Sequence, residues 1–171
     1  MAEKQTVGLG LLGFGTVGAG VVDLLQRHGE LLARRTGLKL ELRGIADLDV
    51  ESDRGVTVDP GLLSTDAAAL IERADIDIVV QLIGGTGTAR ELALKALGMG
   101  KPVVTANKAL LATHGEELVN AAREHGADLY FEASVGGGIP VIRSLREGLI
   151  GNHIEAIYGI LNGTCNYMLT R

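Results

Sequence analysis

The stretch Val7-Gly-Leu-Gly-Leu-Leu-Gly-Phe-Gly-Thr-Val-Gly-Ala-Gly-Val-Val22 decides the fold of this 171-residue chain. Its apolar start predicts a buried strand, and the glycines after it predict a turn that opens a helix. Gly13, Gly15 and Gly18 have the G-x-G-x-x-G spacing that brings backbone close to the diphosphate of a dinucleotide and lets the helix pack on the strand. The diphosphate then lies on unpaired N–H groups at the positive end of the helix. We therefore expect cofactor contacts along Gly13, Phe14, Gly15, Thr16, Val17 and Gly18.

Composition and charge narrow the class of protein. An apolar content of 46% with 22% charged residues is typical of a soluble domain with a sizeable core. A net charge of −5 and only 3% aromatic residues argue against a nucleic-acid partner, and no apolar run is long enough to span a membrane. The single cysteine, Cys165, cannot form an internal disulfide, which fits a reducing compartment. We expect a cytoplasmic protein with no nucleic-acid or membrane partner.

Strand and helix patterns alternate along the rest of the chain. The long first helix, with Gly29 as a candidate break, is expected to end at Gly37, and residues 51–63 read as a loop. Thr113 and Glu116 have capping-box spacing and predict the start of a helix. After the first strand, strands are expected at 38–46, 75–85, 101–106 and 128–133, and later helices at 64–74, 88–99, 113–125 and 140–149. This alternation predicts an α/β fold, a doubly wound parallel sheet of the Rossmann type, with ligand outside the carboxyl ends of the strands.

A second domain is expected near the end of the sequence. Residues 153–162 resemble a new strand. We divide the chain into a dinucleotide-binding domain, residues 1–146, and the beginning of an α+β substrate and dimerisation domain, residues 147–171.

Asp47 follows the second expected strand, where this fold places the carboxylate that holds the adenosine ribose. It lies 29 residues past Gly18 rather than the usual ~20, and the long first helix can absorb the excess. A carboxylate repels the 2′-phosphate of NADP, so Asp47 favours NAD. Asp49 competes for the role, Arg54 could approach a phosphate, and both aspartates could instead be turn formers. Gly84, Gly85 and Thr86 predict a second cofactor loop after the third strand.

Five segments in order resemble the homoserine dehydrogenase family. They span nearly the whole chain, apart from the ends and residues 48–63, and the third and fifth motifs below are more specific than the glycine motif. The segments are Gly13-Phe-Gly-Thr-Val-Gly18, Leu82-Ile-Gly-Gly85, Val104-Thr-Ala-Asn-Lys-Ala-Leu-Leu111, Phe131-Glu-Ala-Ser-Val-Gly-Gly-Gly-Ile-Pro140 and Gly159-Ile-Leu-Asn-Gly-Thr-Cys-Asn-Tyr167. The resemblance implies NAD(P)-dependent interconversion of L-aspartate 4-semialdehyde and L-homoserine, on the route to threonine and methionine, by a protein that is a homodimer at full length.

The resemblance also implies roles for individual residues. It places Asn107 and Lys108 at the nicotinamide side, with Lys108 as the catalytic candidate, because an ammonium can stabilise or protonate the alkoxide formed by hydride transfer. Taken alone, Lys108 could be a surface charge. Gly163 is expected to contact cofactor, and Asn162, Thr164 and Tyr167 to contact substrate; a capped strand-to-helix turn is the plainer interpretation of that segment.

A sodium site is the third implication of the resemblance. Its ligands are the Glu132 carboxylate and the carbonyl oxygens of Val135, Gly137 and Ile139, and such hard oxygen ligands suit the ion. The alternative is that Glu132 caps the helix that begins near Pro140.

The sequence departs from the family pattern in two places. Asp47-Leu48 stands where a basic residue is common, and Gln81 stands where we expect a glutamate before Leu82-Ile-Gly-Gly85. The acidic residues and second lysine that serve the substrate would lie beyond Arg171, so we expect a fragment that binds cofactor and is inactive alone. Two alternatives remain open: another small-substrate dehydrogenase with the same first domain, and a non-catalytic NAD-sensing module.

Overall fold

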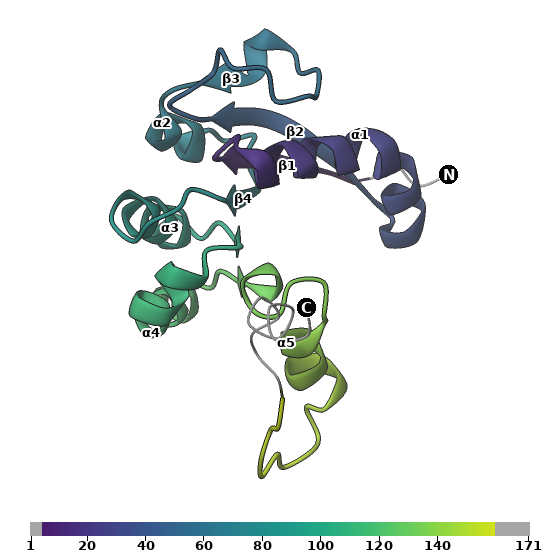
Figure 1. Ribbon diagram of the computed structural model, residues 1–171, viewed down its shortest axis with the longest axis vertical. Helices are drawn as coiled ribbons and strands as arrows, with labels where there is room; N and C mark the ends of the chain where they lie inside the picture. The colour runs from purple at the N-terminus through teal and green to yellow at the C-terminus, as the bar shows by residue number, and fades with distance from the viewer. Residues whose placement is uncertain (1–4, 160–171) are drawn as a thin grey trace, which may run out of the picture.

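A six-stranded parallel sheet in the order β3-β2-β1-β4-β5-β6 forms the centre of the computed structural model (Figure 1). The structure describes residues 5–159. The strands are β1 (Gln5–Leu12), β2 (Leu38–Ala46), β3 (Leu63–Ser64), β4 (Ile78–Gln81), β5 (Val103–Thr105) and β6 (Leu129–Tyr130). Because β2 and β4 flank β1, the strand order reverses direction at β1. The doubly wound parallel sheet expected from the sequence is confirmed.

Helices cover both faces of this sheet. They are α1 (Thr16–Thr36), α2 (Ala67–Glu72), α3 (Thr88–Gly98), α4 (Lys108–Glu124) and α5 (Val141–Arg143), with a π-helical turn at Ser144–Gly148 and 3-10 turns at Pro60–Leu62 and Glu132–Ser134. In Figure 1, α2, α3 and α4 line one side of the sheet and α1 lies on the other. None of the helices in residues 5–159 is long and apolar enough to cross a membrane.

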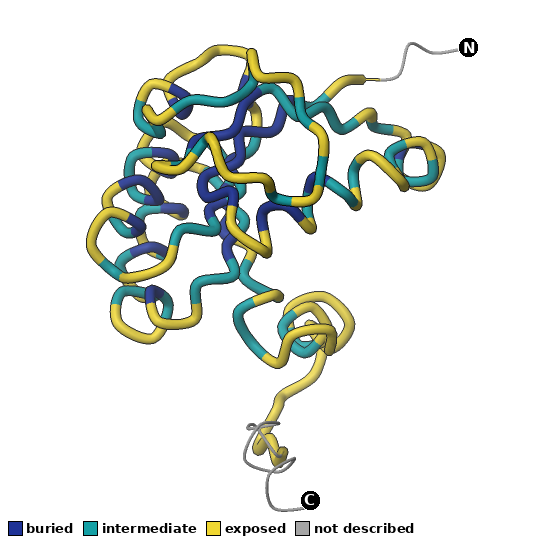
Figure 2. The backbone as a smooth tube through the Cα atoms, turned by 45° about the horizontal axis from the view of Figure 1, so that its top comes forward, coloured by how far each residue is buried: buried dark blue, intermediate teal, exposed yellow. Residues whose placement is uncertain are grey.

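The core consists of two hydrophobic clusters, one on each face of the sheet. Leu12 belongs to the cluster under α2, α3 and α4, whereas its neighbour Leu11 packs with Phe14 and Val22 under α1. Both leucines are fully buried, because successive residues of a strand point to opposite faces. Figure 2 shows the buried backbone concentrated along the strands between the helices. A sheet covered on both sides explains why its strands read as continuous apolar runs.

The long first helix is confirmed. α1 runs through Gly29 without a break and ends at Gly37, which has a left-handed φ of 76° and donates its N–H to the Ala33 carbonyl oxygen at 3.0 Å. Arg34 and Arg35 lie in the last turn, where the helix dipole favours positive charge.

The predicted start of the fourth helix is wrong. α4 begins at Lys108, and the Asn107 side chain caps it by accepting the Leu110 N–H at 3.0 Å. The Thr113 hydroxyl donates to the Ala109 carbonyl at 2.8 Å, so Thr113 lies inside the helix and is not its cap. His114 has non-helical dihedrals (φ −132°, ψ 16°), so the helix kinks where the capping-box pattern suggested a beginning.

Several shorter elements also differ from expectation. β3 was not expected, because two residues are too few to show a strand period, and its carboxyl end leads to Asp66, which caps α2 by accepting the Ala69 N–H at 2.9 Å. β6 stops at Tyr130, and the chain then makes the 3-10 turn at 132–134. The strand predicted from His153 is wrong over residues 153–159, where no strand forms; a strand is stable only when a neighbour pairs with it.

The turn between β1 and α1 requires glycine at two positions. Gly13 has a φ of 99°, and a Cβ there would lie 2.9 Å from the Leu82 carbonyl carbon. A Cβ on Gly18 would lie 2.2 Å from the carbonyl oxygen of Gly13, so only glycine lets α1 approach the turn this closely. These are the tight-turn and close-packing roles that the sequence motif predicts for these two residues.

Replacing Gly18 by alanine should therefore destabilise the fold. The added methyl group must displace α1 or the turn, at an expected cost of about 1–3 kcal/mol in the free energy of unfolding. Gly20→Ala is the matched control, because it lies on the same helix with nothing within 4 Å of the added Cβ, and alanine there should stabilise by up to about 1 kcal/mol. Urea unfolding measures both variants. Equal stability of the two variants would contradict the close approach.

Candidate functional site

Two adjoining cavities form a cleft along the carboxyl ends of the strands. A cavity of about 690 Å³ is bordered by the glycine turn after β1, by Asp47 after β2 and by the loop after β4. A second cavity of about 390 Å³ extends the cleft toward β5 and the start of α4. Leu82, Ile83 and Gly84 line both cavities. The site thus lies where a doubly wound sheet binds its ligand, beside the reversal of strand order at β1.

The first turn of α1 faces this cleft. Gly15 is the N-cap residue, has no side chain to cap the helix, and has nothing within 4 Å of the Cβ position. The first turn contains no acidic residue, and the first N–H groups of a helix have no intrahelical acceptor. Val17 is 58% exposed and lines the smaller cavity. An anion is the ligand that this arrangement suits.

Asp47 connects the second strand to the glycine turn. One carboxylate oxygen accepts the Phe14 N–H at 2.5 Å and the other accepts the Asp49 N–H at 2.9 Å. Asp47 also lines the larger cavity, together with Gly13 and Gly15. Each carboxylate oxygen keeps a lone pair for a further donor. Phe14 itself is buried and contributes its backbone to this contact.

Asp49 and Arg54 belong to the loop, not to the cleft. Asp49 accepts the N–H groups of Glu51 and Ser52 and pairs with the Arg54 guanidinium at 2.8 Å. These bonds hold the pKa of the Asp49 carboxyl below its ordinary value, with the contacts to Ser52 as the largest cause. Neither Asp49 nor Arg54 lines the cavity, so Asp47 is the better placed of the two aspartates.

The loop after β4 forms the wall shared by the two cavities. Gly84, Gly85 and Thr86 line the larger cavity, and Gly85 has a φ of 77°. The Asn107 amide nitrogen donates to the carbonyl oxygens of Ile83 at 3.0 Å and Gly85 at 2.6 Å. Asn107 therefore joins this loop to the start of α4.

Lys108 is the first residue of α4, is exposed, and lines the smaller cavity beside Asn107. A cation at a helix N-terminus is opposed by the helix dipole, so helix stability alone does not account for a lysine here. The two ends of the cleft thus differ in charge, with Asp47 at one end and Lys108 at the other.

The Glu132 carboxylate caps α5. Its two oxygens accept the N–H groups of Ile142 at 2.9 Å and Arg143 at 2.7 Å. This is the capping alternative drawn from the sequence, and it ties the loop of residues 132–139 to α5. Ala133 and Ser134 line the smaller cavity, so the same loop borders the cleft. Four of the predicted contact residues, Asn162, Gly163, Thr164 and Tyr167, lie outside the described residues.

Sequence reasoning missed part of the cleft lining. Thr65, Ala67 and Ala68 line the larger cavity from the start of α2. A pattern that revealed β3 would have found them, because the residue after a parallel strand lies at the same edge of the sheet as Asp47. Small residues give no chemical signal of their own, and the same applies to Ala133.

An ion pair fixes α3 against α4. The Arg90 guanidinium donates through Nε to Glu117 at 2.6 Å, and its Nη2 contacts the other carboxylate oxygen. Arg90 holds the pKa of the Glu117 carboxyl below its ordinary value. Because α3 follows the shared loop and α4 begins at Lys108, this pair joins the two helices that lead away from the walls of the smaller cavity.

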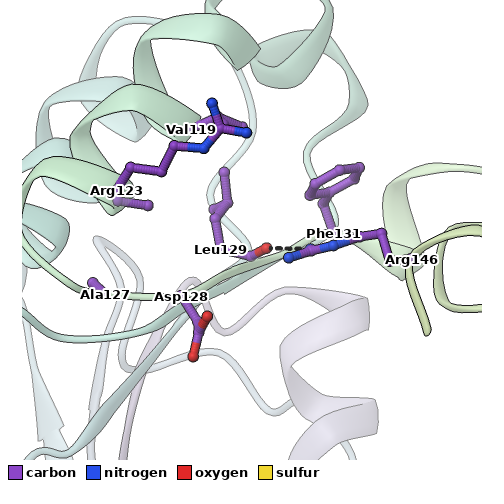
Figure 3. A pocket seen from close by; sticks show the side chains of 8 residues that line it. Val119, Arg123, Ala127, Asp128, Leu129, Phe131 and Arg146 are labelled. Carbon is purple, nitrogen blue, oxygen red and sulfur yellow. Dashed lines mark hydrogen bonds between the residues drawn. The ribbon is translucent and has the colours of Figure 1, made fainter. Parts of the chain in front are cut away.

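A third cavity, of about 230 Å³, lies apart from the cleft. It is formed at β6 by residues that include Val119, Leu129 and Phe131, and it shares no lining residue with the cleft. Figure 3 shows Arg146 reaching the Leu129 carbonyl oxygen, a hydrogen bond of 3.1 Å. The cavity is a junction between α4, β6 and the π-helical turn, and the candidate functional site is the cleft.

Known proteins resemble the chain over almost its whole length. Residues 13–132 match the family described as "Homoserine dehydrogenase, NAD binding domain", and residues 140–171 match "Homoserine dehydrogenase". The homoserine dehydrogenase of Corynebacterium glutamicum is 54% identical over 96% of the chain, which spans 37% of that relative's length.

Solved structures give the same result. The crystal structure of a homoserine dehydrogenase from Thiobacillus denitrificans superposes with a TM-score of 0.88 at 44% identity, covering 96% of this chain and 38% of that one. A hyperthermophilic archaeal homoserine dehydrogenase in complex with NADPH has a TM-score of 0.68 at 29% identity, covering 86% of this chain and 50% of that one.

Proposed function

The chain belongs to the homoserine dehydrogenase family, and on this premise we propose that its cleft binds NAD(P)H for the reduction of L-aspartate 4-semialdehyde to L-homoserine. The observation that carries the proposal is the cleft itself, which joins the glycine turn, Asp47 and Lys108 along one edge of the sheet. Residues 13–18 would hold the diphosphate, Asp47 would hold the adenosine ribose, and the Lys108 end would face the nicotinamide. Gly84, Gly85 and Thr86 contact the cofactor between them.

The chemistry of the reaction gives Lys108 its role. Hydride transfer from the dihydronicotinamide to the aldehyde carbon leaves an alkoxide oxygen, which needs positive charge or a proton. The Lys108 ammonium supplies that charge from the cofactor side, and Asn107 sets its position through the helix cap. Gly163 adds a cofactor contact, and Asn162, Thr164 and Tyr167 add substrate contacts, from the segment outside the described residues.

This chain spans about two fifths of the length of its curated relatives. The complete reaction is therefore proposed for the whole enzyme. In the proposal the 171-residue chain binds cofactor and does not turn over alone. The division at residue 146, the homodimer and the cytoplasmic location stay predictions. The proposed enzyme acts on a small-molecule substrate, whereas an NAD-sensing module does not. The cation of Lys108 favours the enzyme, because a sensor needs no positive charge at the nicotinamide end of the cleft.

A sodium ion at the loop of residues 132–139 is a further part of the proposal. The donor set, a Glu132 carboxylate with the carbonyls of Val135, Gly137 and Ile139, consists of hard oxygens that fit such an ion. Each Glu132 oxygen accepts one N–H of α5 and has a second lone pair available. The ion would join this loop to α5 beside the cleft.

NADH should bind this chain more tightly than NADPH, by about tenfold, because the Asp47 carboxylate repels a 2′-phosphate. Asp47→Asn removes the charge and should bring the two dissociation constants close together. Asp53→Asn is the matched control, since Asp53 lies in the same loop, accepts the Gly55 N–H at 2.8 Å and does not line the cavity. Fluorescence titration with both cofactors measures the ratio. Tighter NADPH binding by the unaltered chain would refute the preference.

Lys108→Ala in the whole enzyme should lower kcat by about 10²-fold or more while changing the KM for cofactor little, because the charge acts on the developing alkoxide. Lys95→Ala is the control and should change neither constant, because it removes a half-buried lysine of α3 that pairs with Glu72 of α2 and does not line the cleft. Steady-state kinetics with aspartate semialdehyde give both constants. Cofactor binding without any turnover by the unaltered whole enzyme would favour a different dehydrogenase or a sensor, and an unchanged kcat would remove Lys108 from the mechanism.

Sodium chloride should raise the melting temperature of the chain above its value in choline chloride, by about 3 °C near saturation. Glu132→Ala should abolish the difference between the two salts, and Glu124→Ala, at the exposed end of α4, should leave it intact. Identical melting in the two salts would leave Glu132 with its capping role alone.

A further inference from the structure

Two polar side chains are fully enclosed in the part of the chain that the structure describes, Gln81 and Thr105, at 0% and 1% exposure. They face each other across β4 and β5, where Gln81 pairs with Thr105 in the strand register. Burying a polar group is costly unless it is hydrogen-bonded. The apolar runs around them show that leucine or valine packs well in this sheet, so the polar pair calls for a reason other than packing.

The hydrogen bonds of this pair form a closed ring. The Thr105 hydroxyl donates to the Gln81 Oε1 at 2.7 Å, and the Gln81 Nε2 donates to the Ile83 carbonyl oxygen at 2.8 Å. The Asn107 N–H donates back to the Thr105 hydroxyl at 3.1 Å, and the Asn107 amide donates to the same Ile83 carbonyl at 3.0 Å. The ring therefore binds the end of β4, the end of β5 and the cap of α4 to one another.

Two members of the ring, Ile83 and Asn107, lie at the cleft. Ile83 is part of the wall shared by the two cavities, and Asn107 precedes Lys108 at the start of α4. Gln81 itself lines neither cavity, so it acts through the groups it holds. Holding Ile83 requires a donor and holding Thr105 requires an acceptor, and a neutral amide supplies both on one side chain.

We propose that Gln81 is a positioning residue of the cofactor cleft, which sets the shared wall at Ile83 and the first turn of α4 relative to each other. The inference rests on the proposed function of the cleft, and it accounts for the glutamine that departs from the family pattern. A glutamate at this position can replace the amide only while its carboxyl carries a proton, because the ionised form has no hydrogen to donate to Ile83.

The test replaces Gln81 by glutamate in the 171-residue chain and measures NADH affinity across pH. Burial that raises the pKa of a carboxyl by about 3 units leaves Gln81→Glu protonated at about pH 6 and largely ionised at about pH 9. Its affinity for NADH should match that of the unaltered chain at the lower pH and be about tenfold weaker at the higher pH. Gln81→Met, which loses the ring without gaining charge, should bind about fivefold more weakly at both pH values.

The controls separate the ring from general effects of charge and pH. Gln26→Glu makes the same change at an exposed glutamine whose Nε2 donates to the Thr57 carbonyl at 2.6 Å, and its affinity should follow the unaltered chain. Neither sheet partner of Gln81, Leu12 or Thr105, is titratable. The described titratable groups that line the cleft are Asp47 and Lys108, which every variant retains, so their titration cancels in the comparison.

A second measurement does not depend on cofactor. Amide exchange at Asn107 and Leu110, whose N–H groups bond to Thr105 and Asn107, should be faster in Gln81→Glu than in the unaltered chain at about pH 9 and equal at about pH 6. If the unaltered chain binds no NADH, the proposed function fails and this exchange still decides the role of Gln81. Affinity and exchange that do not change with pH relative to the unaltered chain, whether normal or lost at both values, would overturn the inference.

Discussion

The contact between the Gly13 carbonyl oxygen and the backbone of Gly18 is the constraint on which the rest of the structure depends. It fixes the distance and direction at which α1 leaves β1, and so it determines where the first turn of that helix points. The same turn contacts the segments that follow both neighbouring strands. Its Phe14 N–H donates to the Asp47 carboxylate after β2, and Gly13 packs on the backbone of Leu82 after β4. The same backbone contacts therefore determine both how α1 packs on the sheet and how its first turn faces a ligand.

Polar groups around the cleft follow a common pattern. Asp47, Asn107 and Glu132 each form hydrogen bonds with the backbone of another segment, and each thereby joins a loop that borders the site to a second segment. Loops held in this way need little reorganisation when a ligand enters, because their donors and acceptors are already oriented. Lys108 differs from these three residues, since it is exposed at the beginning of its helix.

The sequence was sufficient for the sheet and for most of the cleft, because both depend on strong local signals. Alternating apolar runs and glycine turns revealed five strands, and parallel strands bring the residues that follow them to one edge. β3 was missed because its two residues owe their strand conformation to pairing with β2. The start of α4 was missed because Asn107 caps it with no glutamate three residues on, while a capping-box pattern lies farther along, inside the helix.

The contacts among the polar residues could not be read from the sequence either. Gln81 was visible as one polar residue in an apolar strand, but its partners depend on the register of β4 against β5. The role of Glu132 as a cap of α5 depended likewise on how the chain turns between residues 134 and 140. In both cases the residue type allowed several roles, and the tertiary structure determines which hydrogen bonds the side chain forms.

The kink at His114 divides α4 into two helical segments. Its first segment is fastened to the loop after β4 through Asn107, and its second segment is fastened to α3 through Glu117 and to the core through Leu118. The backbone between the two segments leaves helical geometry at His114. The segment that borders the cleft and the segment that packs on α3 are therefore two separately anchored pieces of one helix.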